Sequence, residues 1–307
     1  MSSRLVIVGP TGSGKSELAT RVVGELDAAE ILCVDSMTVY RGMDIGTAKP
    51  TASDRAGVPH HGLDLVDPDV DYSVAEFQRY ADRVIAATAG RGSNLVMVGG
   101  TGLYVDAVVN GFSIPAQYPD IRRSLQAELE SEGVDKLYAR LVILDPEAAS
   151  RMEPNNDRRV VRALEVCIGS GRPFSSYGPG LQATRSDERA DLPVIVGILW
   201  PRDELRCRIE FRFAMQIGDG FVEEAASLRS AFGDRLSRTA RQALGYRELW
   251  AHLDGLCTLD EAIETAIVRT RQFSVRQERW FRRDPRIRWL EPEEAARISV
   301  DELLGRR

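Results

Sequence analysis

Short apolar runs alternate with amphipathic stretches along much of the chain. Four of the runs have the length and composition of buried strands, at 5–8, 31–34, 95–98 and 194–199. The stretch 74–85 instead repeats its apolar residues at helical spacing, and the serine before it is a typical helix cap. Strands that alternate with helices in this way predict an α/β fold, with a P-loop NTPase-like parallel sheet flanked by helices.

Residues 111–190 interrupt this alternation. Prolines and glycines punctuate short helical patterns there, and no run before Pro193 has the character of a buried strand. We therefore predict a catalytic core formed by 1–113 and 191–307. An inserted, mainly helical domain is expected at 114–190.

Further helices are predicted from spacing and caps. After the fourth run, apolar residues recur at every fourth position, at Leu205, Ile209, Phe213 and Ile217. Within the insertion a helix is expected to begin at Asn156-Asp157 and to end at Gly169 and Gly171. Other helices are expected around 238–252 and 259–283, whereas 37–68 is expected to be an ordered loop.

Composition and cysteine usage limit the class of protein. The chain has 307 residues, of which 43% are hydrophobic and 28% charged, as in an ordinary soluble globular protein. Its four cysteines are scattered without a C-x-x-C pair, so neither a disulfide framework nor a zinc site is predicted. No leader pattern and no apolar run long enough to cross a bilayer is visible. We expect a cytoplasmic protein without a membrane partner.

The charge distribution leaves the nature of the partner open. A net charge of −6 argues weakly against nucleic acid when the chain is considered as a whole. Eight arginines nevertheless lie between Arg269 and Arg288. Such a local stripe either binds phosphates or forms a solvated helix face.

The first apolar run leads directly into a glycine-rich sequence with the spacing of a P-loop. It consists of Gly9, Pro10, Thr11, Gly12, Ser13, Gly14, Lys15 and Ser16. Its glycines allow backbone N–H groups to point inward at the start of a helix and to form a nest for anions. Lys15 is expected to reach the outer phosphates and Ser16 to bind Mg²⁺. The alternative is a strand-to-helix turn that binds nothing.

Two more candidate groups follow later strands. Asp35 lies just past the second run, where a carboxylate serves as a magnesium ligand, a general base or a simple cap. The third run ends in Gly99-Gly100-Thr101-Gly102. Paired glycines there either let a ligand approach the backbone or form a tight turn, and Thr101 offers a hydroxyl at the same edge.

Two arginine pairs share helix faces because their members are four residues apart. Arg208 and Arg212 are expected to lie over phosphates held by the P-loop, or to pair with carboxylates such as Glu204 and Glu224. Arg158 and Arg162 form the second pair, in the insertion.

Longer segments complete a pattern that is more specific than the P-loop. They are DSMTVYRGMDIGTAKP at 35–50, GGTGLY at 99–104, RALEV at 162–166, Gly245-Tyr246, and Arg276-Gln277 followed by Trp280-Phe281-Arg282. Over nearly its whole length the chain resembles the tRNA dimethylallyltransferase (tRNA isopentenyltransferase) family. It departs from the family pattern at Gly12, where alanine is common, and at Thr38, where glutamine is usual.

The resemblance implies a prenyl transfer to tRNA. The dimethylallyl group of dimethylallyl diphosphate would move to N6 of the adenosine 3′ to the anticodon, position 37, with release of diphosphate. Lys15, Ser16, Mg²⁺ and an arginine of the 208/212 pair, first of all Arg212, would stabilise the charge on the leaving diphosphate.

The resemblance also implies roles for the remaining residues. Asp35 would take the proton from the adenine amine and Thr101 would help to place the base, which must be flipped out of the anticodon loop. The implied tRNA contacts are Asp35, Ser36, Met37, Thr38, Thr101, Arg123, Asn156, Asp157, Arg158, Arg159, Val160, Gln242, Gly245, Tyr246 and Arg247.

Other functions stay open at this point. A P-loop kinase of a small metabolite would use Lys15 and Ser16 on ATP. An isopentenyltransferase acting on free adenine nucleotides would not need an arginine-bearing insertion. A non-catalytic RNA-binding module would leave Asp35 idle. A monomer is expected.

Overall fold

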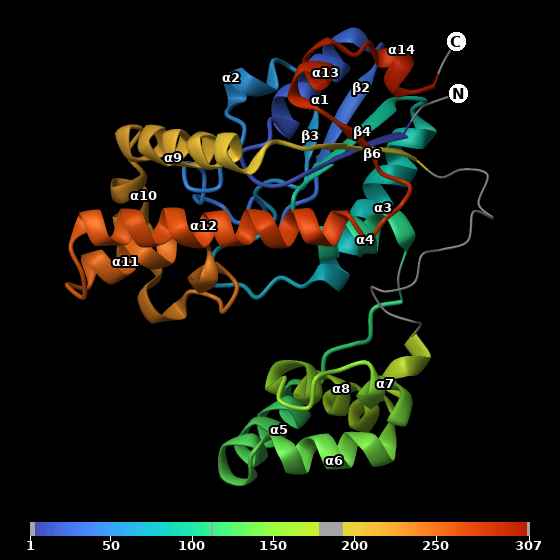
Figure 1. Ribbon diagram of the computed structural model, residues 1–307, viewed down its shortest axis with the longest axis vertical. Helices are drawn as coiled ribbons and strands as arrows, with labels where there is room; N and C mark the ends of the chain where they lie inside the picture. The colour runs from blue at the N-terminus through green and yellow to red at the C-terminus, as the bar shows by residue number, and fades with distance from the viewer. Residues whose placement is uncertain (1–3, 112, 178–192, 306–307) are drawn as a thin grey trace. The chain divides into compact units, whose positions relative to one another are not determined.

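The computed structural model describes residues 4–111, 113–177 and 193–305. The chain divides into two compact units, one comprising Met1–Val109 and Asp187–Arg307, the other Asn110–Ser186 (Figure 1). The second unit therefore begins and ends a few residues before the limits that the sequence suggested for the insertion, 114 and 190. Its role in binding RNA stays a prediction.

A six-stranded sheet forms the centre of the first unit, and all its strand pairings are parallel, in the order β3-β2-β4-β1-β5-β6. The strands are β1 Arg4–Val8, β2 Ala29–Cys33, β3 His60–His61, β4 Asn94–Gly99, β5 Val194–Ile198 and β6 Arg288–Leu290. The predicted α/β class with a parallel sheet is confirmed. The edge strands β3 and β6 were not predicted, because they are too short to produce an apolar run.

Helices cover both faces of the sheet (Figure 1). Leu5 and Ile7 of β1 face a core shared with α1, α13 and α14, whereas Val6 and Val8 face a second core shared with α3 and α4. This alternation follows from the two-residue period of a strand. The helices are α1 Lys15–Glu25, α3 Val74–Gly90, α4 Gly102–Asn110, α13 Pro292–Arg297 and α14 Val300–Leu303.

Four further helices extend the second core. They are α9 Arg202–Gly218, α10 Phe221–Phe232, α11 Tyr246–Leu253 and α12 Leu259–Phe281. The helix expected around 238–252 begins only at Tyr246, because Gly245 has a left-handed backbone with φ of 86°. The remainder of that segment contains a 3-10 turn at Ala240–Gln242, and a similar turn lies at Gly233–Arg235.

The predicted loop 37–68 contains only short regular elements, the helix α2 Ala52–Arg55 and the strand β3. Ser73 caps α3 as expected, since its side chain accepts a hydrogen bond from the N–H of Glu76. Among the described residues, no helix combines the length and the apolar character that a membrane span requires.

The described part of the second unit consists of helices around a small apolar core of its own. They are α5 Pro119–Glu132, α6 Val134–Leu144, α7 Pro146–Ser150, α8 Asp157–Ser170 and a 3-10 turn at Phe174–Tyr177. Asn156 caps α8 as predicted, and Gly171 ends it in a left-handed conformation. Gly169 does not end the helix. A β-carbon there would lie 2.2 Å from the ring of Tyr118, so glycine makes room for that ring.

Burial of the Asp106 carboxylate on α4 disfavours its charged form and so destabilises the folded protein at neutral pH. Its carboxylate accepts a hydrogen bond from Trp280 Nε1 at 2.9 Å, and burial raises its pKa to about 6. A carboxyl whose pKa is raised on folding favours the folded state at low pH and loses that advantage as the pH rises through about 6. We expect Asp106→Asn, which keeps an acceptor for Trp280, to stabilise the protein by on the order of 1–2 kcal/mol at pH 8, and by roughly half as much at pH 5, which lies between the unfolded and the folded pKa.

Thermal melts of both proteins at the two pH values measure this difference. Asp82→Asn, at an exposed position of α3, serves as the control and should change neither melting temperature. A stabilisation by Asp106→Asn of the same size at pH 5 and pH 8 would contradict the assignment.

Candidate active site at the carboxyl edge of the sheet

The strand order brings three distant segments together. β4 lies between β1 and β2. The carboxyl end of β1 leads into the P-loop, that of β2 into Asp35 and that of β4 into Thr101. Because parallel strands end at the same edge of a sheet, these three segments are neighbours.

The P-loop turns tightly between β1 and α1. Gly12 and Gly14 have left-handed backbones, with φ of 81° and 86°. The helix starts at Lys15, and no side chain caps it. Within the described residues the N–H groups of Gly12, Gly14, Lys15 and Ser16 have no hydrogen-bond acceptor. Together with the helix N-terminus they form an open nest for an anion.

Lys15 and Arg212 hold positive charge against this loop. Lys15 Nζ donates to the carbonyl oxygen of Pro10 at 2.7 Å, and Arg212 donates to the hydroxyl of Thr11 at 3.4 Å. Loss of hydration lowers the pKa of Lys15 to about 7, and repulsion by Arg212 adds to the effect, while Asp35 opposes it. Burial also lowers the pKa of Arg212. Two poorly hydrated cations in contact with neutral groups favour the binding of an anion.

Arg208 is held in a different way. Its Nε donates to the carbonyl oxygen of Gly12 at 2.7 Å, and its guanidinium lies over the ring of Trp200, 4.3 Å from the ring centre. Trp200 Nε1 in turn donates to the carbonyl oxygen of Ser13 at 2.9 Å. The structure thus brings both arginines of the 208/212 pair to the P-loop, where Arg208 and Trp200 brace its main chain.

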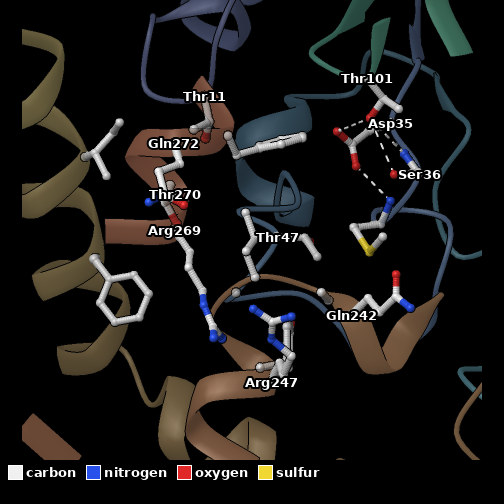
Figure 2. Close-up of a pocket in the computed structure, with 18 of the residues that line it drawn as sticks. Thr11, Asp35, Ser36, Thr47, Thr101, Gln242, Arg247, Arg269, Thr270 and Gln272 are labelled. Carbon is white, nitrogen blue, oxygen red and sulfur yellow. Dashed lines mark hydrogen bonds between the residues drawn. The ribbon is translucent and has the colours of Figure 1, made fainter. Parts of the chain in front are cut away.

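Asp35 and Thr101 form a hydrogen-bonded pair, shown in Figure 2. The hydroxyl of Thr101 donates to Asp35 Oδ2 at 3.3 Å and accepts the N–H of Ser36 at the same distance. The other carboxylate oxygen, Oδ1, accepts the N–H of Met37 at 2.8 Å. Asp35 therefore does cap a turn, as one interpretation of the sequence suggested. Capping uses only Oδ1, and Oδ2 remains hydrogen-bonded to the hydroxyl of Thr101.

A cavity of about 550 Å³ adjoins the P-loop and this pair. Figure 2 shows Asp35, Ser36 and Thr101 on one side of it and Arg247 and Arg269 on another. The lining includes several residues that sequence reasoning did not assign to a site, among them Thr47, Arg269, Thr270, Gln272 and Arg276.

The Arg269 side of the cavity contains a buried carboxylate. Glu248, whose side chain is 2% exposed, pairs with Arg269 at 2.5 Å and with Arg247 at 3.0 Å. Two guanidinium groups on one carboxylate leave a net positive charge at this wall. Arg269 was missed because its stripe was judged by charge alone. Its spacing from Arg276, seven residues or two helical turns, was the available signal.

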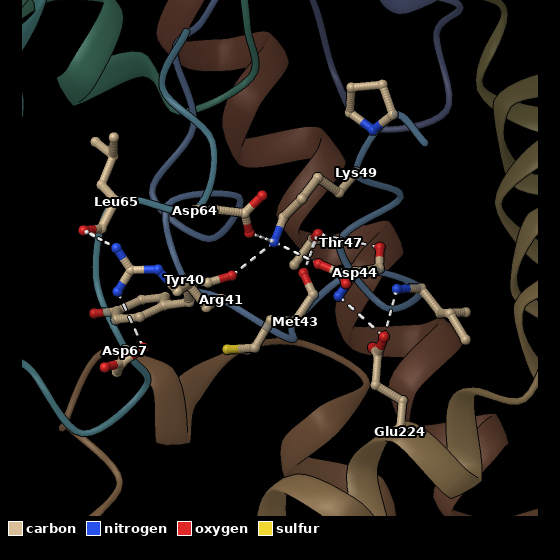
Figure 3. Close-up of polar contacts among 12 residues, drawn as sticks. Tyr40, Arg41, Met43, Asp44, Thr47, Lys49, Asp64, Leu65, Asp67 and Glu224 are labelled. Carbon is tan, nitrogen blue, oxygen red and sulfur yellow. Dashed lines mark hydrogen bonds and ion pairs between the residues drawn. The ribbon is translucent and has the colours of Figure 1, made fainter. Parts of the chain in front are cut away.

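The loop 37–68 is held by a buried lysine (Figure 3). Lys49 Nζ donates to the carbonyl oxygen of Tyr40 at 2.7 Å and pairs with Asp44 at 2.5 Å and with Asp64 at 2.6 Å. Both carboxylates are partly exposed, whereas the lysine side chain is 3% exposed. The lysine therefore ties three points of the loop together and fixes its course beside the cavity.

A second anchor of this loop is Glu224, also drawn in Figure 3. Its carboxylate accepts three consecutive N–H groups, those of residues 44–46, at 2.8–3.2 Å. It also accepts the hydroxyl of Tyr246 at 2.5 Å. Glu224 was a candidate partner for Arg208 and Arg212, and that expectation is wrong because its oxygens are occupied by the loop. The carbonyl oxygen of Thr47, in the same loop, accepts a hydrogen bond from Arg212 at 3.5 Å.

The predicted RNA contacts of the first unit differ in their exposure. Gln242 and Arg247 are exposed, and Met37 lines the cavity. Tyr246 also lines the cavity, but its side chain is fully buried and its hydroxyl donates to Glu224, and its contact with RNA stays a prediction. Thr38 is 8% exposed, and its hydroxyl has no hydrogen-bond partner among the described residues.

Gly245 is also buried, where it forms the turn before α11. Its N–H donates to Glu248, the carboxylate that pairs with Arg247 and Arg269. Gly245 therefore supports this wall of the cavity through its backbone.

Of the residues predicted to contact RNA from the second unit, one is buried. Arg123, Asp157, Arg158 and Arg159 are exposed, and Asn156 is partly exposed. Val160 is fully buried in the apolar core of this unit, so its side chain does not reach a partner and that prediction is wrong.

The two arginines of the second pair, Arg158 and Arg162, have different surroundings. Arg162 donates to the carbonyl oxygen of Pro115 at 2.8 Å and pairs with the buried Glu165. It serves the fold of the second unit, whereas Arg158 stays exposed on α8.

The arginine stripe is largely neutralised within the protein. The ion pairs are Arg269 with Glu248, Arg271 with Glu210, Arg282 with Glu278, Arg286 with Asp284, and Arg288 with Glu294 and Glu302. The pairs of Arg269, Arg271 and Arg288 join α12 and β6 to other helices, whereas those of Arg282 and Arg286 are local. The stripe is therefore not a continuous free surface for phosphates.

The parallel sheet, the open anion nest and the adjacent acid–hydroxyl pair define a P-loop-like protein with a carboxylate beside an anion-binding loop. Over residues 38–284 the sequence matches the IPP transferase family. The tRNA dimethylallyltransferase of Streptomyces coelicolor is 44% identical over 299 residues, which cover 97% of this chain and 93% of that protein. The chain belongs to the IPP transferase family.

Solved structures agree with this assignment. A tRNA isopentenylpyrophosphate transferase from Bacillus halodurans superposes with a TM-score of 0.67 at 37% identity, over 99% of this chain and 94% of that one. A eukaryotic dimethylallyltransferase acting on tRNA superposes with a TM-score of 0.79 at 25% identity, over 100% of this chain and 81% of that one. The family that the sequence motifs suggested is confirmed.

The two lysines of the first unit should respond to replacement in opposite ways. Lys15 is poorly hydrated and contacts only a neutral carbonyl, so Lys15→Met should raise the melting temperature of the ligand-free protein. Inorganic diphosphate should no longer stabilise this variant, although it stabilises the wild-type protein. Lys49→Met should lower the melting temperature by several degrees, because it leaves two carboxylates without their partner.

Melting curves with and without inorganic diphosphate test both expectations. Lys136→Met, at an exposed position of the second unit, is the control and should behave as wild type. A lower melting temperature for ligand-free Lys15→Met would show that this side chain is structural.

Proposed function

We propose that the protein transfers the dimethylallyl group of dimethylallyl diphosphate to N6 of adenosine 37 in tRNA, with release of diphosphate. The observation that carries the proposal is the placement of the Asp35–Thr101 pair beside the P-loop, in one cavity. A kinase would also use the nest and a carboxylate beside it, so the family of the chain decides between the two reactions. The names of the relatives support the same reaction.

The P-loop would bind the diphosphate. The open N–H groups of Gly12, Gly14, Lys15 and Ser16 would bind its oxygens, and Lys15 would leave the Pro10 carbonyl to contact them. Arg212, with Arg208 behind the loop, would add charge as the allylic C–O bond breaks and negative charge grows on the leaving diphosphate. These cations act most strongly in the transition state because they are poorly hydrated.

A Mg²⁺ ion fits the same place. The Ser16 hydroxyl is exposed at the start of α1, and hydroxyl and phosphate oxygens are ligands that Mg²⁺ accepts. No group of three metal-binding His, Cys, Asp or Glu side chains occurs in the described part of the chain, so most ligands would come from diphosphate and water. The ion would supply further positive charge to the leaving group.

Asp35 would act as the general base. As the bond between adenine N6 and the allylic carbon forms, the proton of the amine would pass to Asp35 Oδ2, the oxygen that does not cap the turn. Thr101 would hold this oxygen in position and contact the base. Loss of the base is typically worth about 10²–10⁴-fold in rate.

The tRNA would present a flipped adenine to the cavity, since N6 is inaccessible within a stacked anticodon loop. Gln242 and Arg247 of the first unit, and Arg123, Asn156, Asp157, Arg158 and Arg159 of the second, are the exposed or partly exposed candidates for contacts with the loop. A cytoplasmic location and a monomeric state stay predictions.

The direct test incubates the protein with Mg²⁺, dimethylallyl diphosphate and an unmodified tRNA that has adenosine at position 37. Digestion and mass spectrometry should reveal N6-dimethylallyladenosine only when both substrates are present. Consumption of ATP in the presence of metabolites, without this product, would favour the kinase. Prenylation of free AMP in preference to tRNA would favour the adenylate enzyme.

Asp35→Asn should separate chemistry from binding. The amide keeps an oxygen for the Met37 N–H but cannot take a proton, so the single-turnover rate should fall by about 10²–10⁴-fold. The dissociation constant for dimethylallyl diphosphate should change by less than about threefold, because the diphosphate contacts lie in the P-loop. Asp82→Asn is the matched control, and a near-normal rate for Asp35→Asn would refute the assignment.

Arg158→Ala combined with Arg159→Ala should weaken tRNA binding and reduce its dependence on salt. Each lost phosphate contact should lower the slope of log K against log[salt] by about 0.7–0.9. The control is the double variant Lys136→Ala and Arg140→Ala, which removes the same charge from exposed positions of α6 in the same unit. Equal slopes in the two double variants would show that the start of α8 does not contact RNA.

A further inference from the structure

A single buried glutamine joins the two halves of the site. Gln277 lies on α12 and is 6% exposed. Its Oε1 accepts the N–H of Thr11 in the P-loop at 2.9 Å. Its Nε2 donates to the carbonyl oxygen of Gly100, directly before Thr101, at 2.8 Å. One side-chain amide therefore spans the anion nest and the segment that carries the Asp35 partner.

The orientation of this amide is fixed by its partners. A backbone N–H requires an acceptor and a carbonyl oxygen requires a donor, so the reversed amide would lose both bonds. Both bonds are largely shielded from water, and a residue that lacks the amide would leave the two backbone groups unpaired. Glutamine is thus matched to this position by chemistry as well as by length.

Gly100 provides the space for this contact. A β-carbon at Gly100 would lie 2.6 Å from Gln277 Nε2. Its φ is not in the left-handed region, so the requirement for glycine here is close approach rather than backbone conformation. The sequence suggested that the paired glycines admit a ligand or form a turn. The group that approaches Gly100 is the side chain of Gln277.

The bond to Thr11 also shapes the anion nest. The Thr11 N–H points to Gln277 Oε1 and is not available to a phosphate. The nest is left with the N–H groups of Gly12, Gly14, Lys15 and Ser16, which begin one residue further from β1. Gln277 therefore influences where an anion rests relative to the sheet edge.

α12 is rigidly anchored at the point where Gln277 emerges. Trp280, one turn further on, donates from Nε1 to Asp106 on α4 at 2.9 Å. Toward the start of the helix, Arg271 pairs with Glu210 on α9 and Arg269 pairs with Glu248 on α11. The glutamine is thus presented by a helix that three other helices hold in place.

We propose that Gln277 is a positioning residue that sets the distance between the diphosphate nest and the Asp35–Thr101 pair. The inference rests on the proposed prenyl transfer, in which the allylic carbon must lie between these two groups. Gln277 does not contact either substrate. It acts through the Thr11 N–H and the Gly100 carbonyl oxygen, whose spacing it fixes.

Gln277→Ala should slow the chemical step more than it weakens binding. A misplacement of about 1 Å costs as much as 10²-fold in rate, so the single-turnover rate should fall ~10–100-fold. The dissociation constants for dimethylallyl diphosphate and tRNA should change by less than about threefold, because Lys15, Arg212 and the exposed arginines remain. Ser274→Ala is the matched control, since Ser274 is a buried polar residue of α12 that bonds only within its own helix.

A double-mutant cycle identifies the contact itself. Gly100→Ala should slow the wild-type protein ~10–100-fold, because the added methyl displaces the Gln277 amide. In the Gln277→Ala background the same substitution should change the rate less than about threefold, since the displaced group is absent. Additive effects of the two substitutions would overturn the proposal.

All rates are measured well below the melting temperature of each variant, with the folded fraction determined beforehand. A single-turnover rate for Gln277→Ala within twofold of wild type would show that the glutamine is only structural. Because Gly100→Ala alone also tests the spacing, poor folding of one variant leaves the other to decide. Absence of product from wild-type protein would overturn the proposed function together with this inference, whereas product with unchanged variants overturns this inference alone.

Discussion

The adjacency of β2, β4 and β1 is the constraint on which the site depends. Three parallel strands that end side by side place a carboxylate and a hydroxyl in a cavity that Thr11 of the P-loop also lines, although these groups lie up to about ninety positions apart in the sequence. No single loop could supply all three. The sheet must stay intact for the site to exist, which explains why both of its faces are covered by apolar cores.

The ion pairs distinguish charged side chains that hold the fold together from charged side chains that remain available to a ligand. Lys49 has two carboxylate partners, and the Arg269–Arg247 wall has Glu248. Lys15, by contrast, donates only to a carbonyl oxygen, and burial depresses its pKa to about 7. Neutralised ions fix loops and helices, whereas the poorly hydrated Lys15 at the P-loop has only the charge of Asp35 to favour its protonated form in the free protein, and a bound anion would favour that form further.

The fold could be predicted largely because its signals are local. The apolar runs located the four main strands, and the P-loop located the nest, since each pattern specifies a backbone conformation within a few residues. The roles of Glu224, Glu248 and Gln277 could not be derived in this way. Glu224 and Gln277 bond to segments more than 170 positions away, and Glu248 bonds across to the next helix, so a single sequence does not reveal these partners. The prediction for Val160 was wrong for a related reason, because membership of a motif does not distinguish a residue that packs beneath a surface from one that lies on it.

The pairing of the arginine stripe resolves the apparent conflict between an acidic chain and an RNA substrate. Most arginines between 269 and 288 are occupied with carboxylates, so the core does not present a broad positive face. Arg158 and Arg159 in the second unit are exposed, and none of the ion pairs among the described residues includes them. In the proposed function these two arginines contact the anticodon loop, and the first unit adds charge at the P-loop and at Arg247. An overall charge of −6 is then compatible with both tasks, because each depends on a few local cations rather than on the net charge.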